Sequence, residues 1–186
     1  MAEKAKRAGL EPMPLDLLNE PLVWLFAEHY RHRDICARLT RLSTEVVCDE
    51  PALREVIDFF EIDLPLHIID EEDDLFPLLR RRCEPEDQIE RVLGMLSLDH
   101  SRDQTAAAKV KDLMERALEN QTGLACLADA GTIIANFCAL QKNHIALENA
   151  VVLPIARLRL SDTDLGALSK RLSARRGRLV RTGSEE

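Results

Sequence analysis

Apolar side chains recur every three or four residues through four long stretches of this chain, and this spacing constrains the fold more than any other feature. In the first stretch they are Leu22, Leu25, Phe26, Ile35, Leu39 and Leu42. Such a period places the apolar side chains on one face of an α-helix. The helices predicted in this way cover about 21–47, 51–82, 86–118 and 124–158, with a shorter one at 161–174.

Four long helices joined by short connections pack most simply as neighbours that run in opposite directions. We therefore predict an all-α fold, an antiparallel up-down-up-down four-helix bundle with a short extra C-terminal helix. The expected organisation is an N-terminal arm at 1–18, the bundle at 19–160, and a C-terminal helix with a basic tail at 161–186.

Composition excludes several classes of protein. Hydrophobic residues make up 46% of the chain, enough for a core, but no apolar run reaches the roughly 18 residues of a membrane span. The net charge of −8 argues against a general nucleic-acid binder. The N-terminus has no apolar segment of the secretory type, so we expect a cytoplasmic protein.

Five scattered cysteines, an odd number, contain no C-x-x-C pair. We interpret them as reduced thiols that pack as small apolar residues, and a redox or ligand role is the open alternative.

An internal repeat carries the candidate chemistry. The stretches that begin at His67 and His144 both read H-I-x-x-E-x-x-x-[LV]-[FL]-P. Upstream of each, a lone histidine lies in an [ED]-H-x-R stretch, at His29 and His100. Residues four apart share one helix face, so each H-x-x-x-E pair directs an imidazole and a carboxylate to the same place.

The four histidines are also expected at one depth. Counted from the predicted turns, histidines on neighbouring helices come level to within roughly 5 Å at 1.5 Å per residue. Glu71 and Glu148 lie one turn away. Any one of these histidines alone would be read as a core or boundary residue, but a buried cluster of imidazoles and carboxylates without a metal is costly to desolvate. We therefore predict a metal site formed by His29, His67, Glu71, His100, His144 and Glu148.

Six nitrogen and oxygen ligands exceed the needs of one tetrahedral zinc and suit two metal ions such as iron or manganese. Ferritin-like di-iron proteins use Glu-x-x-His, whereas here histidine comes first and the spacing is four. The order of the residues therefore disfavours the ferritin-like class.

At these residues the sequence resembles the hemerythrin-like, or HHE cation-binding, family, over about 20–160. The stretches that carry the resemblance are LFAEHYRHRDIC, PLHIIDEEDDLFPLL, LDHSRD and HIALENAVVLP. The resemblance implies a four-helix bundle around two non-haem iron ions, with manganese or zinc as alternatives. It also implies that His29 and His67 bind one metal, that His100 and His144 bind the other, and that Glu71 and Glu148 bridge them.

The oxygen-carrying hemerythrins have an extra histidine on the third helix and an aspartate on the fourth. Ser97, Gln104 and Asn149 occupy the neighbouring positions here, which disfavours a reversible oxygen carrier. We expect a metal-binding module that binds or senses O₂, NO or peroxide. The alternatives are an enzyme that reduces peroxide or NO, and a protein for iron storage or delivery.

Several residues around the predicted ligands are expected to support the site. His32 is expected at the rim of the site, with a ligand role as the alternative. Glu28, Glu72, Asp99 and Asp103 are either hydrogen-bond partners of ligating histidines or surface charges. Pro77 and Pro154 should kink their helices or end the regular part of each, at matching places.

The segment Lys170–Arg181 carries six basic residues and no acidic one. It is interpreted as a solvated helix end and tail. Contact with a protein partner, with the chain's own acidic surface or with a polyanion stays open.

Overall fold

The computed structural model describes residues 12–177. All regular structure within them is helical, which confirms the all-α prediction. The main helices are α1 (Pro21–Leu42), α2 (Glu50–Asp58), α3 (Leu64–Ile69), α4 (Phe76–Arg82), α5 (Ile89–Glu119), α6 (Ala130–Leu147), α7 (Leu153–Arg159) and α8 (Asp162–Arg175). Short 3₁₀ turns lie at η1 (Leu15–Asn19), η4 (Pro85–Asp87) and η5 (Leu124–Cys126).

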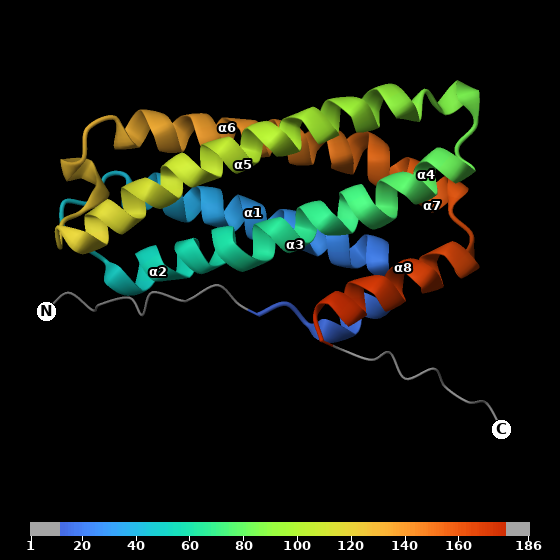
Figure 1. Cartoon of the computed structure of the whole chain (residues 1–186), viewed down its shortest axis with the longest axis horizontal. Helices are drawn as coiled ribbons and strands as arrows, with labels where there is room; N and C mark the ends of the chain where they lie inside the picture. The colour runs from blue at the N-terminus through green and yellow to red at the C-terminus, as the bar shows by residue number, and fades with distance from the viewer. Residues whose placement is uncertain (1–11, 178–186) are drawn as a thin grey trace, which may run out of the picture.

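The helices assemble into long rods (Figure 1). α2, α3 and α4 follow one another in a single rod, as do α6 and α7, while α1 and α5 are rods by themselves. α8 lies at the end of the molecule where α4 and α7 end, and it packs against α1. No helix within 12–177 is long and apolar enough to cross a membrane.

Three π-helical segments interrupt the rods: η2 (Phe59–Asp63), η3 (Asp70–Leu75) and η6 (Glu148–Val152). Each ends two residues before a proline, at Pro65, Pro77 and Pro154. Proline has no N–H and collides with the carbonyl group four residues earlier in an α-helix, and the wider π-turn accommodates it. The matching disturbances predicted at Pro77 and Pro154 are therefore present, as π-turns, and Glu71 and Glu148 lie within them.

The loop after α1 begins earlier than the sequence suggested, because α1 ends at Leu42 and not near residue 47. The Ser43 hydroxyl donates to the carbonyl oxygen of Thr40, which satisfies the helix end. The backbone N–H of Gly123 donates to the carbonyl of Val46, so two loops join at this end of the molecule. A Cβ at Gly123 would lie 2.0 Å from the Glu45 carbonyl oxygen, so only glycine allows this approach.

The loop that begins at Gly123 also makes the fourth rod start later in the sequence than predicted. The sequence predicted a helix from about 124, but η5 and a bend occupy this region and α6 begins at Ala130. Asp129, just before α6, has a φ of 60°, a left-handed conformation that starts a new helix direction.

Two apolar clusters fill the interior and leave a polar layer between them. The loop-end cluster packs the second half of α1 and α5 with α2 and the first half of α6, and includes Ile35, Leu39, Val56, Phe59, Val110, Leu113 and Phe137. The α8-end cluster packs the first half of α1 and α5 with α4, α7 and α8, and includes Leu22, Leu25, Phe76, Leu93, Leu96, Val152 and Leu168. The predicted metal ligands lie in the layer between the two clusters.

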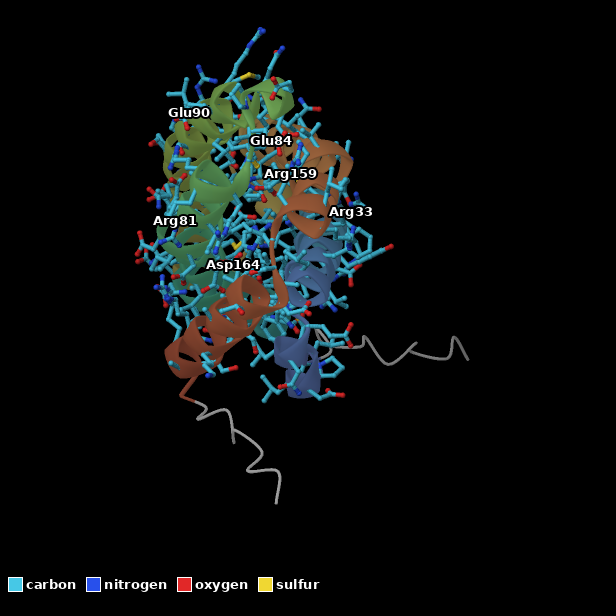
Figure 2. All side chains as sticks on the ribbon, turned by 90° about the vertical axis from the view of Figure 1, so that its right-hand side faces the viewer. Arg33, Arg81, Glu84, Glu90, Arg159 and Asp164 are labelled. Atoms are coloured by element: carbon cyan, nitrogen blue, oxygen red, sulfur yellow. The ribbon has the colours of Figure 1, made fainter. Side chains whose placement is uncertain are left out.

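Ion pairs close the α8 end of the molecule, onto which Figure 2 looks directly. Arg82 forms a two-bond pair with Asp164 of α8, with both N–O distances at 2.9 Å. Arg159 binds Glu84 at 3.1 Å and Asp87 at 2.8 Å, which fixes the end of α7 to the turn before α5. The N-cap Ser161 and Asp164 form a capping box at the start of α8, the short C-terminal helix that the sequence predicted.

Candidate metal centre

Six buried side chains from four rods converge in the polar layer: His29, His67, Glu71, His100, His144 and Glu148. Each is at most 4% exposed. They form two groups, and within each group the ligand atoms all lie within 4.8 Å of one another. Both groups contain Glu71 and Glu148. His29 and His67 complete one group, and His100 and His144 complete the other.

The two carboxylates lie between the histidines. Glu71 is 3.6 Å from Nε2 of His67 and 3.2 Å from Nε2 of His100, so it faces one histidine of each group. Glu148 does the same, at 3.2 Å from Nε2 of His29 and 3.1 Å from Nε2 of His144. Carboxylates in this position can each bridge two metal ions.

Buried polar atoms of the site lack hydrogen bonds. They include Nε2 of His29 and His67, Oε2 of Glu71, and both carboxylate oxygens of Glu148. Buried polar atoms are nearly always satisfied by protein or water, and each unsatisfied one is costly. Because these unsatisfied atoms point to one place, the residues fit a bound cation.

The outer ring nitrogens fix how three of the histidines are protonated. Nδ1 of His29 donates to Asn149 at 2.8 Å, and Nδ1 of His100 donates to Glu72 at 2.6 Å. Nδ1 of His67 likewise donates to Glu28, at 3.1 Å. The acceptors are oxygens, so the proton lies on Nδ1 and the lone pair of Nε2 faces the centre of the site. A histidine that ligates a metal has this arrangement.

Comparison with known families identifies the domain that carries these residues. The model of the hemerythrin HHE cation-binding domain matches residues 20–156, most of the chain. The chain belongs to the hemerythrin HHE cation-binding family. No curated protein in the comparison matches it.

Without a metal, the charges of this hemerythrin-like site would be balanced by protons. Burial disfavours a charged His29, but the nearby carboxylates of Glu148 and Glu71 outweigh burial and raise its pKa to about 10. Burial likewise opposes a charged His100, and Glu71 and Glu72 raise its pKa to about 9. Burial alone would raise the pKa of Glu148, but His144 and His29 hold it well below its usual value. The site therefore stabilises an ionised carboxylate at Glu148 and positive charge next to it, on the histidines when no metal is bound.

Four acidic residues were predicted either to support ligating histidines or to remain at the surface, and the structure separates them. Glu28 and Glu72 support His67 and His100 by the hydrogen bonds given above. Asp103 faces Nδ1 of His144, but at 3.9 Å, too far for a hydrogen bond. Asp99 instead pairs with Arg102 on the surface of the same helix.

Two supporting contacts were missed by the sequence analysis. Asn149, considered only as the position of a missing aspartate, accepts a hydrogen bond from Nδ1 of His29. Ser97 donates its hydroxyl to Glu72 at 2.9 Å and so holds the carboxylate that supports His100. Ser97 lies one turn before His100, which is the spacing that could have revealed the contact.

His32 lies outside both groups of ligand atoms, although it is 3% exposed. Its Nδ1 is 3.0 Å from Oε1 of Gln141, and its ring centroid is 4.5 Å from that of His67. Burial and the neighbouring His67 and His29 lower its pKa well below the usual value, so the ring is neutral. His32 therefore packs beside the first group.

The basic segment at the C-terminus contacts the chain's own acidic side chains. Arg171 and Arg175 bind Asp74, and Arg175 also binds Asp70. Arg176 binds Asp70 at 2.6 Å and Glu28 at 2.8 Å, with its guanidinium 4.7 Å from the ring centre of Trp24.

A chain of contacts thus runs from Arg176 through Glu28 to His67. Among the alternatives given for the basic segment, contact with the chain's own acidic side chains is the one that these three arginines show. Arg178 and Arg181 lie outside the described residues, and a protein partner at the tail stays a prediction.

Proposed function

We propose that this protein holds two non-haem iron ions in the polar layer and uses them to bind or sense a small oxidant or diatomic molecule, namely O₂, NO or peroxide. His29 and His67 would bind one ion, His100 and His144 the other, and Glu71 and Glu148 would bridge both. The surrounding rods would form the antiparallel up-down-up-down bundle, and the five free cysteines suit a reducing compartment such as the cytoplasm.

One observation carries the proposal. Ligand atoms of four histidines and two carboxylates form two buried groups that share both carboxylates. Among these atoms, Nε2 of His29 and His67, Oε2 of Glu71 and both oxygens of Glu148 have no hydrogen-bond partner. Imidazole and carboxylate ligands suit iron, with manganese or zinc as alternatives, and paired metals in proteins lie about 3.5–4 Å apart with bridging oxygens between them. Bound iron would supply electrons to, or coordinate, the small molecule.

The supporting residues argue against a reversible oxygen carrier. Asn149 and Ser97 lie near the positions where oxygen carriers have additional metal ligands, and both are engaged in holding other side chains in place. We therefore favour sensing or binding, and keep as second candidates a reductase for peroxide or NO and an iron storage or delivery protein.

The test begins with metal analysis of protein purified without oxygen, followed by separate additions of O₂, NO and peroxide under visible spectroscopy. A stable change in the spectrum at one equivalent supports binding or sensing. Sustained consumption of peroxide or NO would instead assign an enzyme, and release of iron would assign iron handling.

The matched control is the double variant His67→Ala/His144→Ala, which removes one proposed ligand from each group. It should contain no stoichiometric iron and give no spectral change. If that variant responds like the wild-type protein, the proposed centre is not where the reaction takes place.

A further inference from the structure

Contacts between α1 and α6 continue in regular layers beyond the proposed metal ligands. His32 on α1 meets Gln141 on α6, with 3.0 Å between Nδ1 and Oε1. One turn further along α1 is Cys36, and it meets Cys138, nearly one turn back along α6. Residue numbers rise along α1 as they fall along α6, because the two helices run in opposite directions here. The two cysteines therefore lie opposite each other in the layer next to His32.

The helices are close at this layer. The Sγ atom of Cys138 lies 3.6 Å from the backbone carbonyl oxygen of Cys36. Both residues are free thiols and are almost completely buried, at 3% and 4% exposed. They lie at the edge of the loop-end cluster, where the apolar core gives way to the polar layer.

The surroundings make the two sulfurs unequal. The neighbouring Cys36 thiol, the Thr40 hydroxyl and the charge of Lys142 favour a thiolate at Cys138 and lower its pKa to about 7 despite burial. The neighbouring Cys138, together with burial, raises the pKa of the Cys36 thiol. One sulfur is thus suited to attack and the other to remain protonated until the second step.

We propose that Cys36 and Cys138 form a redox-active dithiol that a hydroperoxide oxidises to a disulfide between α1 and α6. The Cys138 thiolate attacks one peroxide oxygen, the O–O bond breaks, and hydroxide leaves and takes up a proton to become water. The sulfenic acid on Cys138 is then attacked by the sulfur of Cys36, the S–S bond forms, and a second water leaves. The two thiols give up two electrons and two protons, and hydrogen peroxide becomes two waters.

The disulfide would join the helix that carries His29 to the helix that carries His144, next to the layer of His32. Oxidation of the thiols would therefore constrain the helices that carry one histidine of each proposed half-site. The dithiol does not depend on the metal ions, so it can be tested in metal-free and metal-loaded protein separately. A thiol reductant would reverse the reaction.

The test exposes the full-length protein to hydrogen peroxide, blocks the remaining thiols by alkylation, and maps peptides without reduction. The expected product is one peptide pair that joins Cys36 to Cys138 within a single chain, with the loss of two free thiols and their recovery after reduction. The oxidised chain should also melt at a higher temperature than the reduced chain, because the link closes a long loop.

Single variants assign the two roles in a background with Cys48, Cys83 and Cys126 changed to Ser. With Cys36→Ser, Cys138 should stop at the sulfenic acid, which dimedone traps. With Cys138→Ser, Cys36 should stay alkylatable under the same exposure.

The proposal is overturned if the exposed Cys126 is oxidised while Cys36 and Cys138 both stay alkylatable. It is also overturned if these two cysteines form links to other cysteines or to other chains only. The peptide map of the wild-type protein decides this even if a serine variant fails to fold.

Discussion

The two halves of the candidate metal centre share one ligand pattern but differ in what lies behind the histidines. Behind His67 is Glu28, which is 7% exposed and bound by Arg176 next to α8. Behind His100 is Glu72, whose side chain is 30% exposed and which is held by a serine hydroxyl. The first half is enclosed by a charged network, and the second half reaches towards solvent.

The internal repeat thus duplicates the proposed ligands but not the residues that support them. His32 and Gln141 add a further layer beside the first half, while the corresponding position after His100 is Asp103, which makes no hydrogen bond to His144. Support for ligating histidines sets their orientation and basicity. We therefore expect the two metal ions to be chemically unequal although their ligands match.

The largest effect is expected from removing a ligand of either half. His67→Ala and His144→Ala should each lose about half of the bound metal or all of it, because each half-site depends on one of them. Metal content per chain after anaerobic reconstitution is the measurement. Wild-type content in both variants would contradict the assignment of both histidines.

The next largest effect, on the free energy of unfolding, is expected from loss of Arg176, which binds Glu28 and Asp70. Arg176→Met keeps the stem over Trp24 but leaves Glu28 and Asp70 without this cation, and Asp70 is fully buried. Breaking a buried ion pair costs about 3 kcal/mol or more. The free energy of unfolding in urea measures it.

The control for this network is Arg171→Met, which removes an arginine whose side chain is 58% exposed. Its partner Asp74 is buried but keeps Arg175, so the loss of the exposed Arg171 should cost only about 0–1 kcal/mol. Equal losses in the two variants would show that Arg176 has no special role behind the first half.

Metal removal should lower stability by a comparable amount. Ligand that binds only the native state adds about 2.7 kcal/mol at a concentration near a hundred times Kd. The melting temperature should therefore fall on chelation and recover with ferrous iron. Because Glu72 is more exposed than Glu28, we expect the second half to release its metal first, in two resolved phases. A melting temperature that is unchanged after metal loss would exclude a site in the core.

The smallest effect is expected at His32, which lies outside both groups of ligand atoms. His32→Gln should keep two irons per chain and change only the rate or the pH dependence of the reaction with O₂, NO or peroxide. Metal analysis and stopped-flow kinetics measure the two quantities. If the variant binds only one iron, His32 is a ligand and the two half-sites do not have matching ligands.

Local periodicity predicted much of this architecture. The spacing of apolar residues predicted the helices, and the repeat predicted that six side chains from four helices would meet, as they do. Their role as ligands stays a prediction. Pro77 and Pro154 indicated disturbed helices because the effect of proline acts within a few residues.

What the sequence did not reveal depends on contacts between distant segments. Arg176 and Glu28 are 148 residues apart, and no pattern in either segment indicates their ion pair. The loop that follows the early end of α1 is likewise held by a backbone hydrogen bond from Gly123 to Val46. Such contacts arise only once the helices have packed.

The most direct test of the dinuclear centre is anomalous diffraction at the iron edge from crystals of the reconstituted protein. The account predicts two peaks in the polar layer, one beside His29 and His67 and one beside His100 and His144, with Glu71 and Glu148 between them. A single peak, or peaks away from these six side chains, would contradict it.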